Sequence, residues 1–175
     1  MELTADQKGA IAESAIVHAA IKLGIGVFRP LTDGHRYDLV FEVDDRLLRI
    51  QCKWAVQLEN VVMVRCYSAR RTINGMLNRP YTADEVDLVA AYCASIDRCF
   101  VLPPELFGGR RHVHLRLRSA RNNQSQGINW ADDYSFDRLA STSTNGAVAQ
   151  LGERRAGSAK ARGSSPLGST QVQAR

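Results

Sequence analysis

The sequence predicts one α/β domain, and three observations lead to that fold class. A chain of 175 residues, 45% of them hydrophobic, is long enough for one compact core and short for two. An Ala-rich segment with helical spacing comes first, and short β-prone segments separated by turn residues follow it. From residue 140 onward, aromatic residues and apolar periodicity disappear. We therefore expect a domain over residues 1–139 and a disordered basic tail over residues 140–175.

The first expected element is a helix that begins after Thr4. Thr4 and Gln7 have the spacing of a capping box, and Gly24 is a typical helix end. Among the acids of this helix, Glu13 is the one that we expect to point inward. Apolar residues recur at helical spacing at Ile11, Ala15, Ile16, Ala19, Ala20 and Leu23.

A three-strand meander is expected next, over residues 27–31, 37–43 and 46–54. The second segment alternates around an apolar core, and a turn-forming Asp-Asp pair separates it from the third. Residues 61–67 predict a further strand. Residues 68–81 contain turn signals and several arginines, and they predict an exposed, functional loop.

The second half of the domain also predicts strands. Residues 86–93 and 98–102 are strand-like around a short turn, although Thr82 could instead cap a helical turn. We favour strands. Residues 103–107 predict a helical turn, and residues 112–118 predict an amphipathic strand with one basic face.

The net charge of +5 is weak support for a nucleic-acid partner. Residues 146–175 hold five basic side chains against one acid, and the rest of the chain holds 18 against 17. Two tail segments, residues 148–150 and 163–166, can be back-translated into sequences that resemble the D-arm and T-arm of a tRNA gene. One interpretation of the tail is therefore read-through of such a gene.

Two classes of protein are not expected. No apolar run approaches the roughly 20 residues that span a bilayer, and no signal peptide is visible, so we expect a cytoplasmic protein that does not bind membranes. The four cysteines lack the spacing of zinc ribbons or thioredoxin-like sites, so we expect reduced core cysteines.

Three polar residues of the meander fall on neighbouring strands. Asp38 lies on the second strand, and Gln51 and Lys53 lie on the third. Residues two apart share one face of a strand, and paired strands lie about 4.8 Å apart. A carboxylate inside an apolar strand needs a partner or a metal ion, which disfavours a simple turn role for Asp38. We expect the three side chains to form one cluster.

Such a cluster has the groups that phosphodiester hydrolysis requires. The reaction needs a divalent cation held by hard oxygen ligands and an attacking hydroxide that is formed and oriented. Asp38 supplies a carboxylate, and Lys53 supplies charge beside the water. The arrangement resembles the PD-(D/E)xK nuclease superfamily, with Tyr37-Asp38 at the PD element and Gln51-Cys52-Lys53 at the (D/E)xK element.

The Gln variant resembles the group I intron homing branch of that superfamily. Residues 9–13, 36–40 and 81–92 add to the resemblance, as do Arg118 and residues 122–124, and it covers roughly residues 7–138. It implies a restriction-endonuclease-like core, in which helices flank a mixed sheet.

The resemblance also implies a metal site and its ligands. Tyr37 replaces a proline that only shapes the strand, whereas Gln51 replaces an acid and removes a negative charge from the metal site. The expected ion is Mg²⁺, with Mn²⁺ as a substitute, and weaker metal binding is predicted. Its expected ligands are Asp38, the Gln51 side chain and the backbone carbonyl of Cys52, with Glu13 lending charge. Glu13, Asp38, Gln51 and Lys53 are thus the expected catalytic residues.

The expected function is a site-specific homing endonuclease that hydrolyses phosphodiester bonds of double-stranded DNA. Arg70, Arg71, Asn74 and Arg79 are the expected DNA contacts, because their stretch contains no acid. Cutting both strands calls for two active sites, so we expect a homodimer or homotetramer.

Two alternatives remain open. A Holliday-junction resolvase would share the metal site but select branched DNA by its shape. If Gln51 marks a decayed site, the protein is a catalytically inactive module for DNA binding or assembly.

Overall fold

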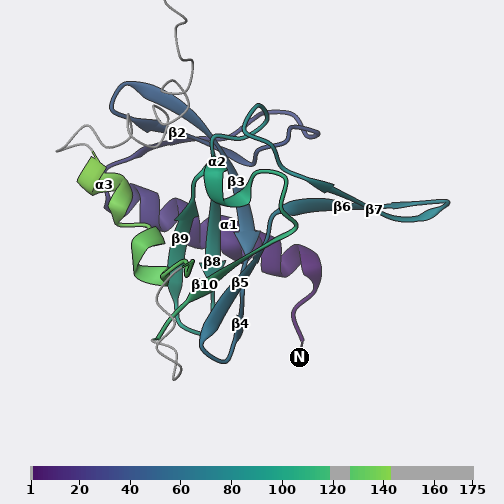
Figure 1. Cartoon of the computed structure of the whole chain (residues 1–175). Coiled ribbons are helices and arrows are strands. Elements are labelled where there is room, and N and C mark those ends of the chain that lie inside the picture. Colours follow the sequence, from purple (N-terminus) through teal and green to yellow (C-terminus); the bar gives the residue numbers. More distant parts are fainter. Residues whose placement is uncertain (1, 119–126, 143–175) are drawn as a thin grey trace, which may run out of the picture.

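The computed structural model describes residues 2–118 and 127–142, which are built around a five-stranded mixed sheet (Figure 1). β3 pairs with β8 in parallel, and the other neighbours in the order β1-β2-β3-β8-β9 pair antiparallel. The strands are β1 (Gly26–Phe28), β2 (Leu39–Val43), β3 (Arg46–Trp54), β8 (Leu88–Cys93) and β9 (Arg98–Leu102). The mixed sheet and its flanking helices confirm the expected fold class.

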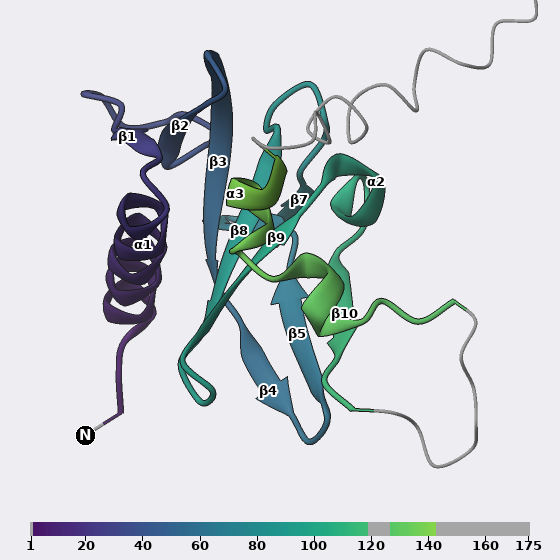
Figure 2. The same cartoon turned by 90° about the vertical axis from the view of Figure 1, so that its left-hand side faces the viewer.

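Helix α1 (Ala5–Lys22) covers one face of this sheet (Figure 2). The predicted capping box is present, because Gln7 N donates to Thr4 Oγ1 at 3.2 Å and Thr4 N donates to Gln7 Oε1 at 2.9 Å. Gly24 follows the helix with a φ of +74°, as expected of a helix end. Ile16 and Ala20 are buried as the sequence predicts, whereas Ile11 is 38% exposed.

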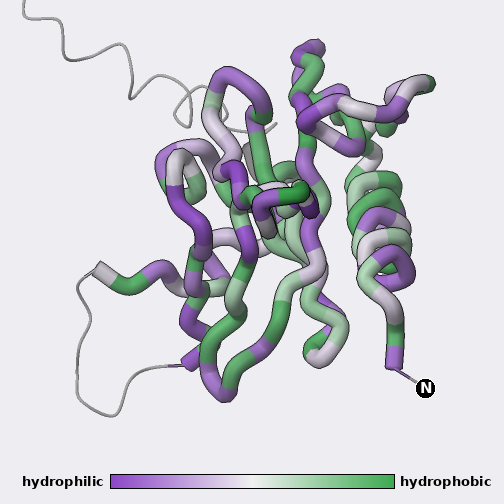
Figure 3. The backbone as a smooth tube through the Cα atoms, turned by 90° about the vertical axis from the view of Figure 1, so that its right-hand side faces the viewer, coloured by the Kyte–Doolittle hydropathy of each residue, from purple (hydrophilic) through white to green (hydrophobic). Residues whose placement is uncertain are grey.

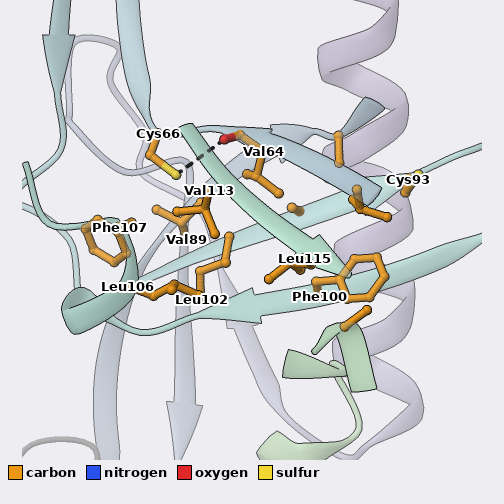
Figure 4. Packing of buried hydrophobic residues seen from close by; sticks show 14 of the residues in the cluster. Val64, Cys66, Val89, Cys93, Phe100, Leu102, Leu106, Phe107, Val113 and Leu115 are labelled. Carbon is orange, nitrogen blue, oxygen red and sulfur yellow. Dashed lines mark hydrogen bonds between the residues drawn. The ribbon is translucent and has the colours of Figure 1, made fainter. Parts of the chain in front are cut away.

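A smaller sheet packs against the opposite face of the main sheet. Its order is β10-β5-β4, from β4 (Val56–Leu58), β5 (Val61–Arg65) and β10 (His112–Arg116). Together with the short helix α2 (Pro104–Phe107), it closes a buried apolar cluster around Val64, Val89, Phe100, Phe107 and Leu115 (Figure 4). β4 is a strand that the sequence analysis did not predict.

The expected loop over residues 68–81 is instead a two-stranded hairpin, which corrects that prediction. β6 (Tyr67–Thr72) pairs with β7 (Gly75–Pro80) in a six-residue ladder. Most residues of both strands are exposed, so neither face of the hairpin is buried. Hydrophilic and hydrophobic residues are mixed along it (Figure 3), without the alternation that marks a half-buried strand. The hairpin projects away from the two sheets (Figure 1), and Ile73 at its tip is 102% exposed.

The last described elements are a 3₁₀ turn, η1 (Ala131–Tyr134), and helix α3 (Arg138–Thr142). Neither was predicted, and α3 extends past residue 139, where we expected the domain to end. The rest of the predicted tail, including the tRNA-like segments, and residues 122–124 lie outside the described residues.

The described part of the chain also bears on the expected state of the cysteines and on membrane spans. Its four cysteines are free, and all except Cys99 are buried. Among the described helices, none is long and apolar enough to cross a membrane.

Candidate active site

Asp38 stands immediately before β2, where the β2–β3 ladder continues by one more hydrogen bond. Asp38 N donates to the Ile50 carbonyl at 2.9 Å, which brings Asp38 beside Gln51. The Asp38 carboxylate is then within reach of the third strand. Its Oδ2 accepts from Cys52 N at 2.8 Å and from Gln51 Nε2.

The side chains of β3 alternate between two environments, and this alternation selects the members of the site. Ile50 and Cys52 belong to the apolar cluster on the α1 side of the sheet. By the period of two along a strand, Gln51 and Lys53 face the opposite side. The structure therefore brings Asp38, Gln51 and Lys53 together, as the sequence analysis expected.

Gln51 is 6% exposed, and among the described residues no other amide or charged side chain is as deeply buried. Its Nε2 donates both to Asp38 and to the Cys52 carbonyl, the latter at 3.2 Å. The amide nitrogen thus sits against the other two expected metal ligands. Rotation of the amide by half a turn exchanges nitrogen and oxygen and turns Oε1 toward the same point.

The donor set fits a hard cation such as Mg²⁺. A carboxylate and a backbone carbonyl converge here, and the half-turn of the Gln51 amide would add an amide oxygen; all three are ligand types that Mg²⁺ and Ca²⁺ accept. No group of three His, Cys, Asp or Glu side chains suited to a metal is found among the described residues. The set therefore depends on Gln51 and the Cys52 carbonyl as well as on acids.

Glu13 lies on α1, on the Ile50 and Cys52 side of the sheet, and among the described residues its carboxylate bonds to Arg29 rather than to Asp38, Gln51 or Lys53. The Glu13 side chain is 29% exposed. Burial raises the pKa of Glu13, and the nearby charge of Asp38 raises it further, against the opposing effect of Arg29. The pKa of Asp38 is also raised, because burial outweighs the Cys52 N–H, Lys53 and other favourable groups. Two carboxylates that are costly to ionise in one place favour a bound cation.

Lys53 is held away from bulk solvent beside Tyr81. Its Nζ donates to Tyr81 Oη at 2.9 Å and lies 4.9 Å from the centre of the Tyr81 ring. Burial lowers the pKa of Lys53, although Asp38 acts in the opposite direction. The ammonium group is therefore easier to deprotonate than that of an exposed lysine.

The four expected DNA-binding residues lie on the β6–β7 hairpin rather than in the Asp38 cluster. Arg70, Arg71 and Asn74 are exposed along its outer part. Arg79 lies nearer the base, where it forms an ion pair with Glu85 while its side chain remains 63% exposed. The hairpin therefore carries exposed cations, and its base at Pro80 leads directly to Tyr81, which contacts Lys53.

Sequence reasoning missed four residues that surround these side chains: Arg29, Arg36, Tyr81 and Glu85. Each acts through a partner distant in sequence, such as Arg36 with Glu85 at 3.2 Å. Arg36, Tyr81 and Glu85 lie within the segments of the family resemblance, residues 36–40 and 81–92, and that was the available signal. Nothing in their spacing linked them to Lys53.

Comparisons with known proteins identify a family and a similar fold. A family model described as PD-(D/E)XK endonuclease matches residues 3–137. The fold is similar to the solved structure of a bacterial homing endonuclease, I-Ssp6803I, with a TM-score of 0.67 and 26% identity. That match covers 85% of this chain and 99% of the other chain. No curated protein matches the sequence.

Proposed function

The chain belongs to the PD-(D/E)XK endonuclease family, and on that basis we propose that it is a metal-dependent, site-specific endonuclease of double-stranded DNA. The observation that carries the proposal is the convergence of Asp38, Gln51 and the Cys52 carbonyl beside Lys53. Similarity to a bacterial homing endonuclease supports a homing role.

The residues of the cluster divide into ligands and a proton-handling group. Asp38, the Gln51 side-chain oxygen and the Cys52 carbonyl would hold the ion, and Glu13 would add negative charge nearby. Mg²⁺, or Mn²⁺ in its place, supplies a Lewis acid that polarises the phosphoryl group and lowers the pKa of water.

Lys53 has a distinct part in the proposed reaction. Its Nζ orients the attacking water and stabilises the charge that develops on the phosphate. Because burial lowers the pKa of Lys53, exchange of a proton between Nζ and the water is easier than at an exposed lysine.

The β6–β7 hairpin is proposed to bind the DNA backbone through Arg70, Arg71, Asn74 and Arg79. Loss of a phosphate contact weakens binding and lowers its salt dependence. Replacing Arg70 and Arg71 together by alanine should lower the slope of log K against log salt by about 2. A slope equal to that of the wild type would remove these two residues from the DNA interface.

Cleavage of both strands requires two copies of the cluster, because the described chain contains one. We therefore propose a symmetric homodimer or homotetramer as the active species. Light scattering of the DNA-bound protein tests this, and a strict monomer that still makes double-strand breaks would refute it.

The experiment that tests the proposed function is cleavage of genomic and supercoiled DNA with Mg²⁺ or Mn²⁺. Asp38→Asn and Lys53→Met preserve the shape of each side chain while removing its charge. Discrete products that vanish in both variants support a site-specific nuclease. Cleavage confined to four-way junctions indicates a resolvase, and DNA binding without any cleavage indicates an inactive module.

A further inference from the structure

Contacts connect Lys53 to a second cation through one buried tyrosine. Tyr81 is 3% exposed, and its Oη accepts from Lys53 Nζ at 2.9 Å. The Arg36 guanidinium lies 4.3 Å from the centre of the same ring. Two cations thus contact one neutral side chain inside the protein.

Arg36 in turn is tied to the base of the β6–β7 hairpin. Its Nη1 donates to Ser68 Oγ at 2.6 Å, and its Nη2 donates to the Pro80 carbonyl at 3.1 Å and to Glu85 Oε2 at 3.2 Å. The Arg36 side chain is 21% exposed. Since Arg36 also stands two residues before Asp38, it joins the hairpin base to the strand that carries the carboxylate.

Burial of two neighbouring cations is unfavourable unless each finds fixed partners. Arg36 has several, whereas the hydrogen bond and the ring contact of Lys53 Nζ are both with Tyr81. Burial raises the pKa of the Tyr81 phenol, so its hydroxyl stays neutral and can accept a hydrogen bond from the ammonium group. A phenylalanine at this position would keep the ring but lose the acceptor that fixes the direction of Nζ.

We propose that Tyr81 is a positioning residue for the nuclease reaction: its hydroxyl holds the Lys53 ammonium in place, and Arg36 fixes Tyr81 to the base of the β6–β7 hairpin. The inference rests on the proposed function, because it assigns Tyr81 a part in the same reaction. It places the DNA-binding hairpin and the reacting lysine in one connected unit.

A purely structural role makes a different prediction. If Tyr81 only satisfies a buried charge, removing its hydroxyl lowers the stability of the fold and leaves the cleavage step of the folded fraction unchanged. A positioning role lowers the rate of the cleavage step while DNA affinity and the fold are kept.

The test compares Tyr81→Phe with the wild type on a genomic fragment that the wild type cuts. Single-turnover rates are measured with Mg²⁺ at saturating protein, and dissociation constants are measured with Ca²⁺ in place of Mg²⁺. We expect the rate to fall about 10–100-fold with the dissociation constant unchanged. Tyr92→Phe is the matched control, because its hydroxyl donates to Asp97 at 2.9 Å, outside the cluster, and its rate should equal that of the wild type.

A second readout needs no cleavage. The Lys53 ammonium group, assigned by its loss in Lys53→Met, should give a protected ¹⁵N signal in the wild type that disappears in Tyr81→Phe while the amide spectrum is kept. Arg36→Lys retains the charge but loses the forked donors, and it should lower the single-turnover rate in the same way.

The outcomes separate the two proposals. A wild type that cuts no DNA refutes the nuclease function, and the ammonium signal then decides whether Tyr81 holds Lys53. A wild type that cuts, with Tyr81→Phe cutting equally fast, refutes the positioning role alone. Loss of thermal stability in Tyr81→Phe without a change in the single-turnover rate also refutes the positioning role.

Discussion

Gln51→Glu restores the acid that the family pattern has at this position, and its effect on stability should reverse when Mg²⁺ is added. The change keeps the shape of the side chain but replaces a donor with a second carboxylate. In the wild type, Gln51 Nε2 donates to Asp38 and to the Cys52 carbonyl. In the variant, both contacts become repulsive at neutral pH unless a proton or a cation intervenes.

The expected loss of stability follows from the lost hydrogen bonds and the added charge. A hydrogen bond to a charged acceptor contributes about 1.5–3 kcal/mol, and two unit charges about 4 Å apart repel by about 4 kcal/mol near a protein surface. Uptake of a proton limits this repulsion. We therefore expect the metal-free variant to be less stable by about 2–4 kcal/mol, or about 5–15 °C in Tm.

The stability deficit of Gln51→Glu should also depend on pH. Burial already raises the pKa of Asp38, and a second carboxylate raises the pKa of the pair further. An acid with a raised folded pKa destabilises the fold when it is ionised. The deficit of Gln51→Glu should therefore be complete above the folded pKa and shrink as the pH falls from the folded pKa toward the lower pKa of the unfolded chain.

The assay is thermal unfolding of wild type and Gln51→Glu, at several pH values, with EDTA or with Mg²⁺. Mg²⁺ should raise the Tm of the variant more than that of the wild type, because a carboxylate binds a hard cation better than an amide does. Gln51→Met, which removes polarity without adding charge, is the control and should gain nothing from Mg²⁺. Equal stability without metal and equal gains with Mg²⁺ would refute the metal-site geometry.

Four further changes test the fold around the site. Gly9→Ala should raise the free energy of unfolding by about 0.5–1 kcal/mol, because Gly9 is inside α1 with open space at its Cβ. Gly24→Ala should lower it by about 1 kcal/mol, because the φ of +74° strains alanine, and equal signs for the two would contradict this reasoning. Asp87→Asn should cost about 1 kcal/mol at neutral pH. Burial raises the pKa of Asp87, but hydrogen bonds from Arg49 at 2.7–3.0 Å outweigh burial and lower it overall. This contribution should therefore fade well below pH 3.8, and a deficit that persists there would count against the pair. Phe107→Ala should cost about 3–5 kcal/mol by urea unfolding, since the side chain is fully buried, and a loss below about 1 kcal/mol would contradict the packing.

Local patterns predicted the elements near the site because those elements depend on local chemistry. The capping box of α1 and the β2–β3 turn involve residues only a few positions apart. Asp38, Gln51 and Lys53 met as expected because a tight hairpin sets their register. The parallel pairing of β3 with β8 is long-range and was not predicted, since the family resemblance implied only a mixed sheet.

The missed features depend on contacts distant in sequence or on surfaces that lie fully in solvent. Tyr81 approaches Lys53 from 28 positions along the chain, which no periodicity encodes. The β6–β7 hairpin has no buried face, so its residues lack the alternation by which strands are recognised. The Glu13–Arg29 pair joins helix α1 to the segment after β1. The helix sequence alone could not predict that Arg29 is the partner of Glu13.

The parallel pairing of β3 with β8 has a consequence for how new specificity can arise. Everything between these adjacent strands, including the β6–β7 hairpin, is an insertion whose two ends are fixed by the sheet. The outer part of the hairpin, beyond the Ser68–Arg79 pair, is separate from the core and from the Asp38 cluster. Such an arm is suited to exchange for one of different length and sequence, provided that Ser68, Pro80 and Tyr81 are retained. Chimeras made at this boundary would redirect binding while leaving the hydrolytic chemistry in place.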